Sequence, residues 1–186
     1  MKDQPNGLVF FNMSDMGKYF LSEIFTLVPG EVFTPQIAEE ALVGQFSLNS
    51  GIDVSSYMLE KEGAVVVFPS SPALQDTGAL PFVVKLLEEA DAIEEYNKVI
   101  FHYCSKKKLS HTIIYAGEEL KLVNSFRAES FESALYFLFL SIKGLQMNPR
   151  QCTVQVCCAI NLEQEEIFAR FFKGFKVNNL DIHLQQ

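Results

Sequence analysis

Two residues with catalytic potential, His102 and Cys104, lie two positions apart in the run KVIFHYC. The β-branched and aromatic composition of this run predicts a strand, and residues two apart in a strand share a face. A cysteine beside a histidine could be a thiol nucleophile with its base. Isolated pairs of this kind in apolar strands are more often packed core residues, which is the reading we favour.

Three further groups could bind a ligand. His111 could hold a metal together with Cys104, although no carboxylate and no ligand spacing supports such a site. The run Lys106-Lys107-Lys108 could contact an anion. An acidic run could bind a cation or a basic partner: Glu88, Glu89, Asp91, Glu94 and Glu95. Runs of like charge are usually solvated, so we assign no catalytic, cofactor-binding or metal-binding residue and expect no cofactor.

The bulk composition is that of a globular protein. The 186 residues are 48% hydrophobic and 20% charged, with a net charge of −8, which argues against a nucleic-acid or anionic-membrane partner. No signal-peptide pattern opens the chain, and no apolar run approaches the roughly 20 residues that span a bilayer. The four cysteines lack a CxxC spacing and are expected to be small buried hydrophobes. We therefore expect a soluble cytoplasmic protein.

The first third of the chain carries sparse signals. Residues 7–11, GLVFF, predict a short strand, and the apolar spacing over residues 15–25 predicts a helix. Thr34 followed by Pro35 predicts an N-capped helix that ends near Gly44.

The middle of the chain alternates between apolar and polar stretches. The polar residues 47–62 predict mostly loop, whereas the β-branched run Ala64–Phe68 predicts a buried strand. Three prolines and a glycine predict a loop over residues 69–81. The following stretch, residues 81–97, predicts a helix whose later part is acidic.

The C-terminal part shows clear alternation of strands and helices. Its order is β-β-α-β-α-β, with a hairpin around Gly117-Glu118, and residues 98–104 can supply one more strand in front. This order argues for a mixed α/β sheet. The predicted elements are strands 98–104, 111–116, 119–126, 152–160 and 176–184, a Ser130-capped helix to about Gln146, and an Asn161-capped helix to about Gly174.

The first of these helices is unusually apolar. From Ala134 to Ile142 only Ser141 and the Tyr136 hydroxyl are polar. A helix that is apolar all round is buried on several sides, so we expect it to lie between its own sheet and another layer, a second domain or a partner subunit. Five phenylalanines on the two helices are either core or, if exposed, a docking surface: Phe137, Phe139, Phe168, Phe171 and Phe172.

Three sequence blocks carry a resemblance. LVNSFRAESFESALYFLFLSIKGLQMNP, FTLVPGEVFTPQIAEEAL and VVVFPSSPAL resemble, in this order, blocks of an uncharacterised bacterial family, domain of unknown function 3822. The resemblance covers most of the chain from about Ile24 onward. It implies a divergent actin-like ATPase (ASKHA, ribonuclease H-like) fold, shared with Hsp70 chaperones and sugar kinases. That fold has two halves, each a three-stranded meander followed by α-β-α-β.

The resemblance also implies a domain organisation. Residues 1–96 would form a shortened N-terminal half-domain, because family members begin with a longer segment. Residues 97–186 would form the C-terminal half-domain. The stretch between residues 106 and 126 is short for a complete meander with a phosphate hairpin, so we expect the C-terminal half to be compressed.

The ATPase chemistry of that superfamily lacks its usual residues here. Such enzymes bring two Gly-rich hairpins to the phosphates and hold Mg²⁺ with Asp residues. The chain shows no Asp-x-Gly on a predicted strand hairpin, no Gly-Gly pair, no GxxxxGK[ST] and no GxGxxG. Glu118 and Glu119, next to Gly117, would repel a triphosphate.

We therefore hypothesise a non-catalytic interaction or scaffold protein, a pseudo-ATPase without ATP binding. Its partner would be another protein or a second copy of the chain. The alternative is a nucleotide-binding phosphotransfer enzyme or ATPase of the actin-like superfamily. That alternative requires a deep cleft lined by carboxylates and backbone N–H groups.

Overall fold

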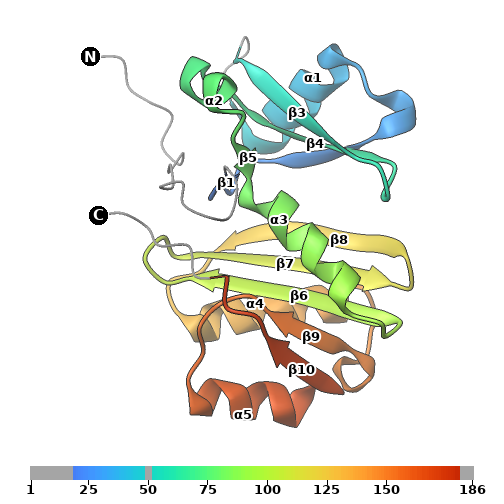
Figure 1. The fold of residues 1–186 in the computed structure, drawn as a ribbon, viewed down its shortest axis with the longest axis vertical. Helices are drawn as coiled ribbons and strands as arrows, with labels where there is room; N and C mark the ends of the chain where they lie inside the picture. The colour runs from blue at the N-terminus through green and yellow to red at the C-terminus, as the bar shows by residue number, and fades with distance from the viewer. Residues whose placement is uncertain (1–18, 49–51, 181–186) are drawn as a thin grey trace. The chain divides into compact units, whose positions relative to one another are not determined.

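A computed structural model describes residues 19–48 and 52–180 (Figure 1). The described residues divide into two compact units, with the division between Val84 and Lys85. The expected boundary between half-domains, after residue 96, stays a prediction, because a compact unit need not coincide with half of an actin-like fold.

The first unit contains a three-stranded antiparallel sheet in the order β2-β4-β3. Its strands are β2 (Thr26–Pro29), β3 (Val54–Leu59) and β4 (Ala64–Pro69). The predicted strand at 64–68 is confirmed, and its Val65 and Val67 lie in the core. The predicted loop over residues 47–62 is wrong from Val54 on. Strand β3 lies at the sheet edge and most of its side chains are at least partly exposed. Its polar serines therefore interrupt the apolar alternation by which a strand is recognised.

Helix α1 (Pro35–Phe46) begins as predicted. The Thr34 hydroxyl oxygen accepts a hydrogen bond from the Ile37 N–H at 3.2 Å, and Pro35 occupies the first turn. Ala38 and Leu42 bury one side of the helix in the core of the unit. The helix ends at Phe46, two residues after Gly44 and so near the predicted position, and Ser47 caps it with a left-handed φ of 51°.

Two predictions in the first unit are wrong. Residues 19–25 are not helical: β1 (Tyr19–Phe20) pairs in parallel with β5 (Leu80–Pro81), because strand pairing overrides the short helical pattern. The predicted loop over 69–81 contains α2 (Pro72–Thr77), whose N–H groups are capped by Ser71. A short 3-10 turn (Gly30–Val32) follows β2. The predicted strand at residues 7–11 lies outside the described residues.

The second unit is built on a five-stranded mixed sheet. Strands β6 (Asn97–Cys104), β7 (Leu109–Ala116) and β8 (Glu119–Arg127) form an antiparallel meander. Strand β9 (Thr153–Val156) pairs in parallel with β6, and β10 (Gly174–Val177) pairs in parallel with β9. The spatial order is β10-β9-β6-β7-β8. This confirms the predicted order, with residues 98–104 as the first strand.

The expected compression of the C-terminal half is wrong. The meander is complete, because the turn between β6 and β7 takes only residues 105–108 and that between β7 and β8 only Gly117 and Glu118. Gly117 adopts φ 64, the left-handed conformation that a two-residue hairpin turn favours in glycine.

Helices α4 (Phe131–Gly144) and α5 (Leu162–Phe171) cover one face of this sheet (Figure 1). The Ser130 hydroxyl caps α4, and Asn161 and Gln164 form a capping box on α5. The 3-10 turn Pro149–Gln151 precedes β9. Helix α5 ends three residues before Gly174, since Phe172 turns back into the core. No helix in the described ranges is long and apolar enough to cross a membrane.

The opposite face of the sheet carries the end of α3 (Phe82–Glu88) and the 3-10 turn Glu89–Ala92 (Figure 1). The predicted helix over residues 81–97 therefore stops early. Glu88, Glu89 and Asp91 place like charges close together at this point, which disfavours continued helix.

Two glycine substitutions in the second unit should have opposite effects. In Gly117→Ala the new Cβ would lie 2.9 Å from the Tyr96 ring at a positive φ, so we expect a loss of about 1–2 kcal/mol. In Gly144→Ala the new Cβ meets nothing within 4 Å, so we expect a gain of up to about 1 kcal/mol. Urea denaturation would measure both, and equal effects would contradict this account of the turn.

Candidate interaction surface

Helix α4 has two apolar sides, of which one lies in the core. Ala134, Leu138 and Ile142 are fully buried against the sheet. On the outer side, Tyr136 is 62% exposed and Leu140 is 48% exposed. Within the described residues, no further layer of this chain fully covers the outer side, so of the expected covers only a partner subunit stays a prediction for that side.

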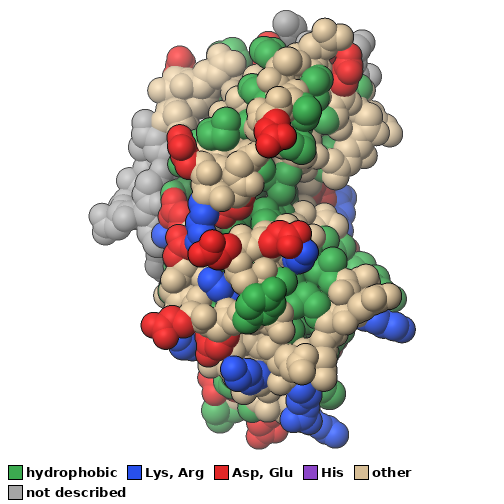
Figure 2. Space-filling model, turned by 90° about the vertical axis from the view of Figure 1, so that its right-hand side faces the viewer, with side chains coloured by type: hydrophobic (Ala, Val, Ile, Leu, Met, Phe, Trp, Pro, Cys, Tyr) green, Lys and Arg blue, Asp and Glu red, His purple; other side chains and the backbone are tan. Residues whose placement is uncertain are grey.

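The outer side of α4 is flanked by aromatic contacts. Phe137 stacks on Phe126 of β8 with ring centroids 4.7 Å apart. Phe139 makes an edge contact of 5.5 Å with Phe171 of α5. We call these side chains together the aromatic surface: Phe126, Tyr136, Phe137, Phe139, Leu140 and Phe171. Exposed apolar side chains also lie among charged ones elsewhere on the molecule, as Figure 2 shows for one face.

The five phenylalanines singled out from the sequence separate into two groups. Phe168 and Phe172 are buried in the core of the second unit. Phe137 and Phe139 are partly buried, and Phe171 is 42% exposed beneath the Arg170 guanidinium. That any of them contacts a partner stays a prediction. Sequence reasoning missed Tyr136 and Leu140, although their i, i+4 spacing places them on one side of the helix.

The histidines of β6 and β7 form a buried cross-strand pair. His102 lies opposite His111, and their Nδ1 atoms are 3.3 Å apart. Burial, reinforced by the neighbouring His111 ring, holds the pKa of His102 well below its ordinary value of 6.5. His102 is therefore neutral at physiological pH and unsuited to take up a proton.

For the suggested Cys104–His102 pair, burial keeps His102 uncharged, which disfavours its action as a general base. Cys104 ends β6 and is only half-buried, and its carbonyl oxygen accepts a hydrogen bond from the Lys107 N–H in the following turn. No cluster of three or more metal-ligating side chains occurs among the described residues.

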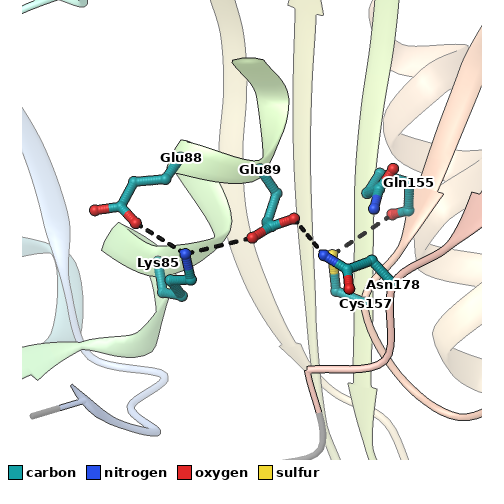
Figure 3. Close-up of polar contacts among 6 residues, drawn as sticks. All are labelled: Lys85, Glu88, Glu89, Gln155, Cys157 and Asn178. Carbon is teal, nitrogen blue, oxygen red and sulfur yellow. Dashed lines mark hydrogen bonds and ion pairs between the residues drawn. The ribbon is translucent and has the colours of Figure 1, made fainter. Parts of the chain in front are cut away.

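The charged runs are mostly surface groups. Lys106 and Lys107 are exposed in the β6–β7 turn, and Lys108 forms an ion pair with Glu129. Of the acidic run, Glu88 and Glu89 have a common partner: Lys85 Nζ lies 3.1 Å from one carboxylate and 3.4 Å from the other (Figure 3). Burial opposes the charge on Lys85, but the two carboxylates outweigh it and raise its pKa.

Glu89 also ties this segment to the end of the sheet. Its carboxylate accepts a hydrogen bond of 2.7 Å from Asn178, which follows β10 (Figure 3). The nearby Cys157 directly follows β9 and is fully buried. Burial, with a smaller contribution from Glu89, strongly raises the pKa of Cys157 and keeps it a thiol. The arrangement is a structural anchor without an activated nucleophile.

Some buried oxygens on this sheet have no hydrogen-bond partner among the described residues. Thr153 Oγ1 and Gln155 Oε1 lie on the Cys157 side of β9, and Ser110 Oγ and Thr112 Oγ1 lie on β7. Unsatisfied groups of this kind lower stability.

Carboxylates are nearly absent from the strands of the second unit. Strands β6, β7, β9 and β10 contain no Asp or Glu, and β8 contains only Glu119, at its start. Two Asp-x-Gly triplets occur elsewhere in the chain. Asp76-Thr77-Gly78 ends helix α2, with Gly78 at φ 61, and is not part of a hairpin. Asp15-Met16-Gly17 lies outside the described residues.

The strand order and the helix pairing define a protein with an actin-like ATPase fold. A crystal structure from Bacteroides thetaiotaomicron, of a protein with actin-like ATPase fold and unknown function, matches with a TM-score of 0.70 at 17% sequence identity. The match covers 86% of this chain and 66% of that one, so the chain spans slightly less than two thirds of the longer protein.

The chain belongs to the protein family of unknown function DUF3822, whose family model matches residues 19–173. This confirms the resemblance seen in the sequence blocks. No functionally curated protein matches the chain.

Titration of His102 should make stability depend on pH. Below about pH 6.5 the unfolded chain binds a proton that the folded chain rejects, so stability falls as the pH decreases, by at most about 1.4 kcal/mol per unit for this group. Denaturation between pH 7.5 and 5, above the range of most carboxylates, would measure it. His102→Gln should flatten the curve, and unchanged slopes would contradict the assignment.

The four cysteines should differ in reactivity. Cys152, Cys157 and Cys158 are buried, and burial raises the pKa of Cys152 as well as that of Cys157. We expect a small thiol reagent to modify Cys104 first in the native protein and the other three only after unfolding. Cys104→Ser should remove the fast phase. Rapid native labelling of Cys157 would be inconsistent with its burial.

Proposed function

We propose that this chain is a non-catalytic interaction protein, in which an actin-like ATPase fold serves as a scaffold without nucleotide chemistry. The observation that carries the proposal is the outward apolar side of α4, where Tyr136 and Leu140 stand exposed beside partly buried phenylalanines. Contiguous exposed apolar side chains of this kind mark contact surfaces.

The exposed apolar side chains of α4 can stabilise a complex more than they stabilise the folded chain. Full burial of a large apolar side chain stabilises by about 1.5–3 kcal/mol, and the outer side of α4 leaves part of that gain unused within the chain. A partner that covers Tyr136 and Leu140 would recover it. The surrounding phenylalanines are already held by their aromatic contacts, so little side-chain order is lost on binding.

The polar chemistry of the second unit supports the non-catalytic part of the proposal. Its histidine pair includes a neutral, buried His102, its Cys157 is a protonated thiol, and Lys85 keeps its charge between two carboxylates. None of these groups has a pKa shifted toward 7 in the way that a general acid, a general base or a nucleophile requires. The near absence of strand carboxylates offers little to hold Mg²⁺, which the phosphotransfer alternative requires.

The net charge and the cysteines bear on the class of partner and on the cellular compartment. A charge of −8 favours a protein partner over nucleic acid. Four free cysteines suit the reducing environment of the cytoplasm, where we place the protein.

Titration calorimetry with Mg²⁺ and ATP tests the proposal. We expect no saturable binding at millimolar nucleotide, because the described strands of the second unit offer almost no carboxylate to hold Mg²⁺ and their hairpin turn carries Glu118 beside Gly117. ADP with Mg²⁺, and ATP with a chelator in place of Mg²⁺, serve as controls. Tight ATP binding that depends on Mg²⁺ would overturn the non-catalytic proposal and favour the enzyme alternative.

A further inference from the structure

The outer side of α4 carries charges as well as apolar groups, in a particular order. At about 100° per residue, four exposed side chains fall within roughly 80° of one another around the helix axis: Glu132, Tyr136, Leu140 and Lys143. An acid lies at the N-terminal end, a base at the C-terminal end, and the two large apolar groups lie between. We call these four residues the α4 stripe.

The two charged groups of the stripe are exposed. Hydrogen bonds from the Ser130 hydroxyl and from the Glu132 backbone N–H lower the pKa of the Glu132 carboxyl, which is therefore ionised at neutral pH. The ion pairs of the second unit join Lys85, Lys108 and Lys121 to other carboxylates. Glu132 and Lys143 form no ion pair with the described residues. Both charges are therefore available to a partner.

Two copies of the α4 stripe are complementary when their helices run in opposite directions, because the acidic end of each then lies beside the basic end of the other. We propose that two copies of this chain associate through α4, with the helices antiparallel about a two-fold axis near Leu138. The inference rests on the proposed function and names the partner that the same surface accepts. In this arrangement Tyr136 of each copy faces Leu140 of the other, and Glu132 of each copy faces Lys143 of the other. A contact repeated in this way is the signature of an isologous dimer.

The charges decide the orientation. Parallel helices in register would bring Glu132 against Glu132 and Lys143 against Lys143, which is unfavourable. Antiparallel helices convert both like-charge contacts into opposite-charge ones. Exposed ion pairs add little affinity by themselves, so their main effect is to select this geometry, while the apolar pair supplies the contact.

The surroundings of the stripe allow close approach. Gly144 at its C-terminal end has no heavy atom within 4 Å of a Cβ position, and Ser133 is small. The backbones of the two helices can therefore approach to the usual 8–10 Å. Phe137 and Phe171 would extend the contact on either side.

The size of the contact sets the expected strength. A helix of 14 residues is about 21 Å long, so a single helix pair buries less than the roughly 800 Å² per partner of a standard interface. We therefore expect a reversible dimer with a dissociation constant in the micromolar range, on the order of 1–100 µM.

Sedimentation velocity over a concentration series from about 1 to about 200 µM tests the dimer. The unmodified chain should pass from monomer to dimer, and Tyr136→Glu should weaken association at least about tenfold. Tyr96→Glu is the matched control, since Tyr96 is 70% exposed on the same unit but outside the stripe, and it should dimerise normally. An unmodified chain that stays monomeric, or a dimer indifferent to Tyr136→Glu, would overturn the proposal.

Charge exchange tests the geometry. Glu132→Lys and Lys143→Glu should each weaken self-association, because each homodimer would then hold two like-charge contacts. Mixed together, the two variants should form a heterodimer in which both contacts are again opposite in sign. Circular dichroism of each variant alone establishes that it is folded. If the mixture of the folded variants associates no more tightly than each variant alone, the antiparallel arrangement is wrong.

The two proposals can fail separately. Binding of ATP with Mg²⁺ would reject the non-catalytic function and leave the sedimentation result standing. A monomeric unmodified chain would reject self-association through α4, while the calorimetric test of the non-catalytic function would be unaffected.

Discussion

The second unit depends on the placement of strand β6 between two very different neighbours. On one side β6 pairs antiparallel with β7, its immediate successor in the chain, and on the other side it pairs in parallel with β9, about fifty residues later. The parallel pairing requires a crossover, and α4 is that crossover. Because α4 must return along the sheet, its inner side is committed to the core and its outer side faces away from the sheet.

The same placement explains why the polar residues of the sheet are chemically quiet. Strand β7 is buried along nearly its whole length, and the centre of β6 is buried with it. Groups that could titrate in water, such as His102 and Cys157, are held in their uncharged forms by burial. The sheet of an actin-like fold is retained here, and among the described strands of the second unit the only carboxylate is that of Glu119.

The apolar content of α4 therefore has two physical explanations instead of one. Leu138 and Ile142 are apolar because they fill the space between helix and sheet. Tyr136 and Leu140 lie outside that core. Much of their apolar surface stays in contact with water after folding, so the free energy of burying it is not gained within this chain. The proposed interaction function and the proposed dimer both rest on this second group.

The sequence by itself determined the local features of the fold. Thr34, Ser130 and Asn161 mark the starts of three helices because their side chains satisfy free N–H groups, and Gly117 marks a hairpin because it tolerates a positive φ. Strand β3 and helix α2 escaped prediction, since an exposed edge strand has no apolar alternation and Pro72 reads as a loop signal as readily as a helix start.

Only the tertiary structure decided which side of α4 is covered. Tyr136 and Leu138 belong to the same apolar run, and apart from the Tyr136 hydroxyl the composition of the run does not distinguish them. The distinction comes from the sheet beneath the helix, which buries Leu138 and leaves Tyr136 exposed. Burial depends on contacts between residues distant in sequence, so a local pattern can show that a helix is apolar but cannot show where its partner layers end.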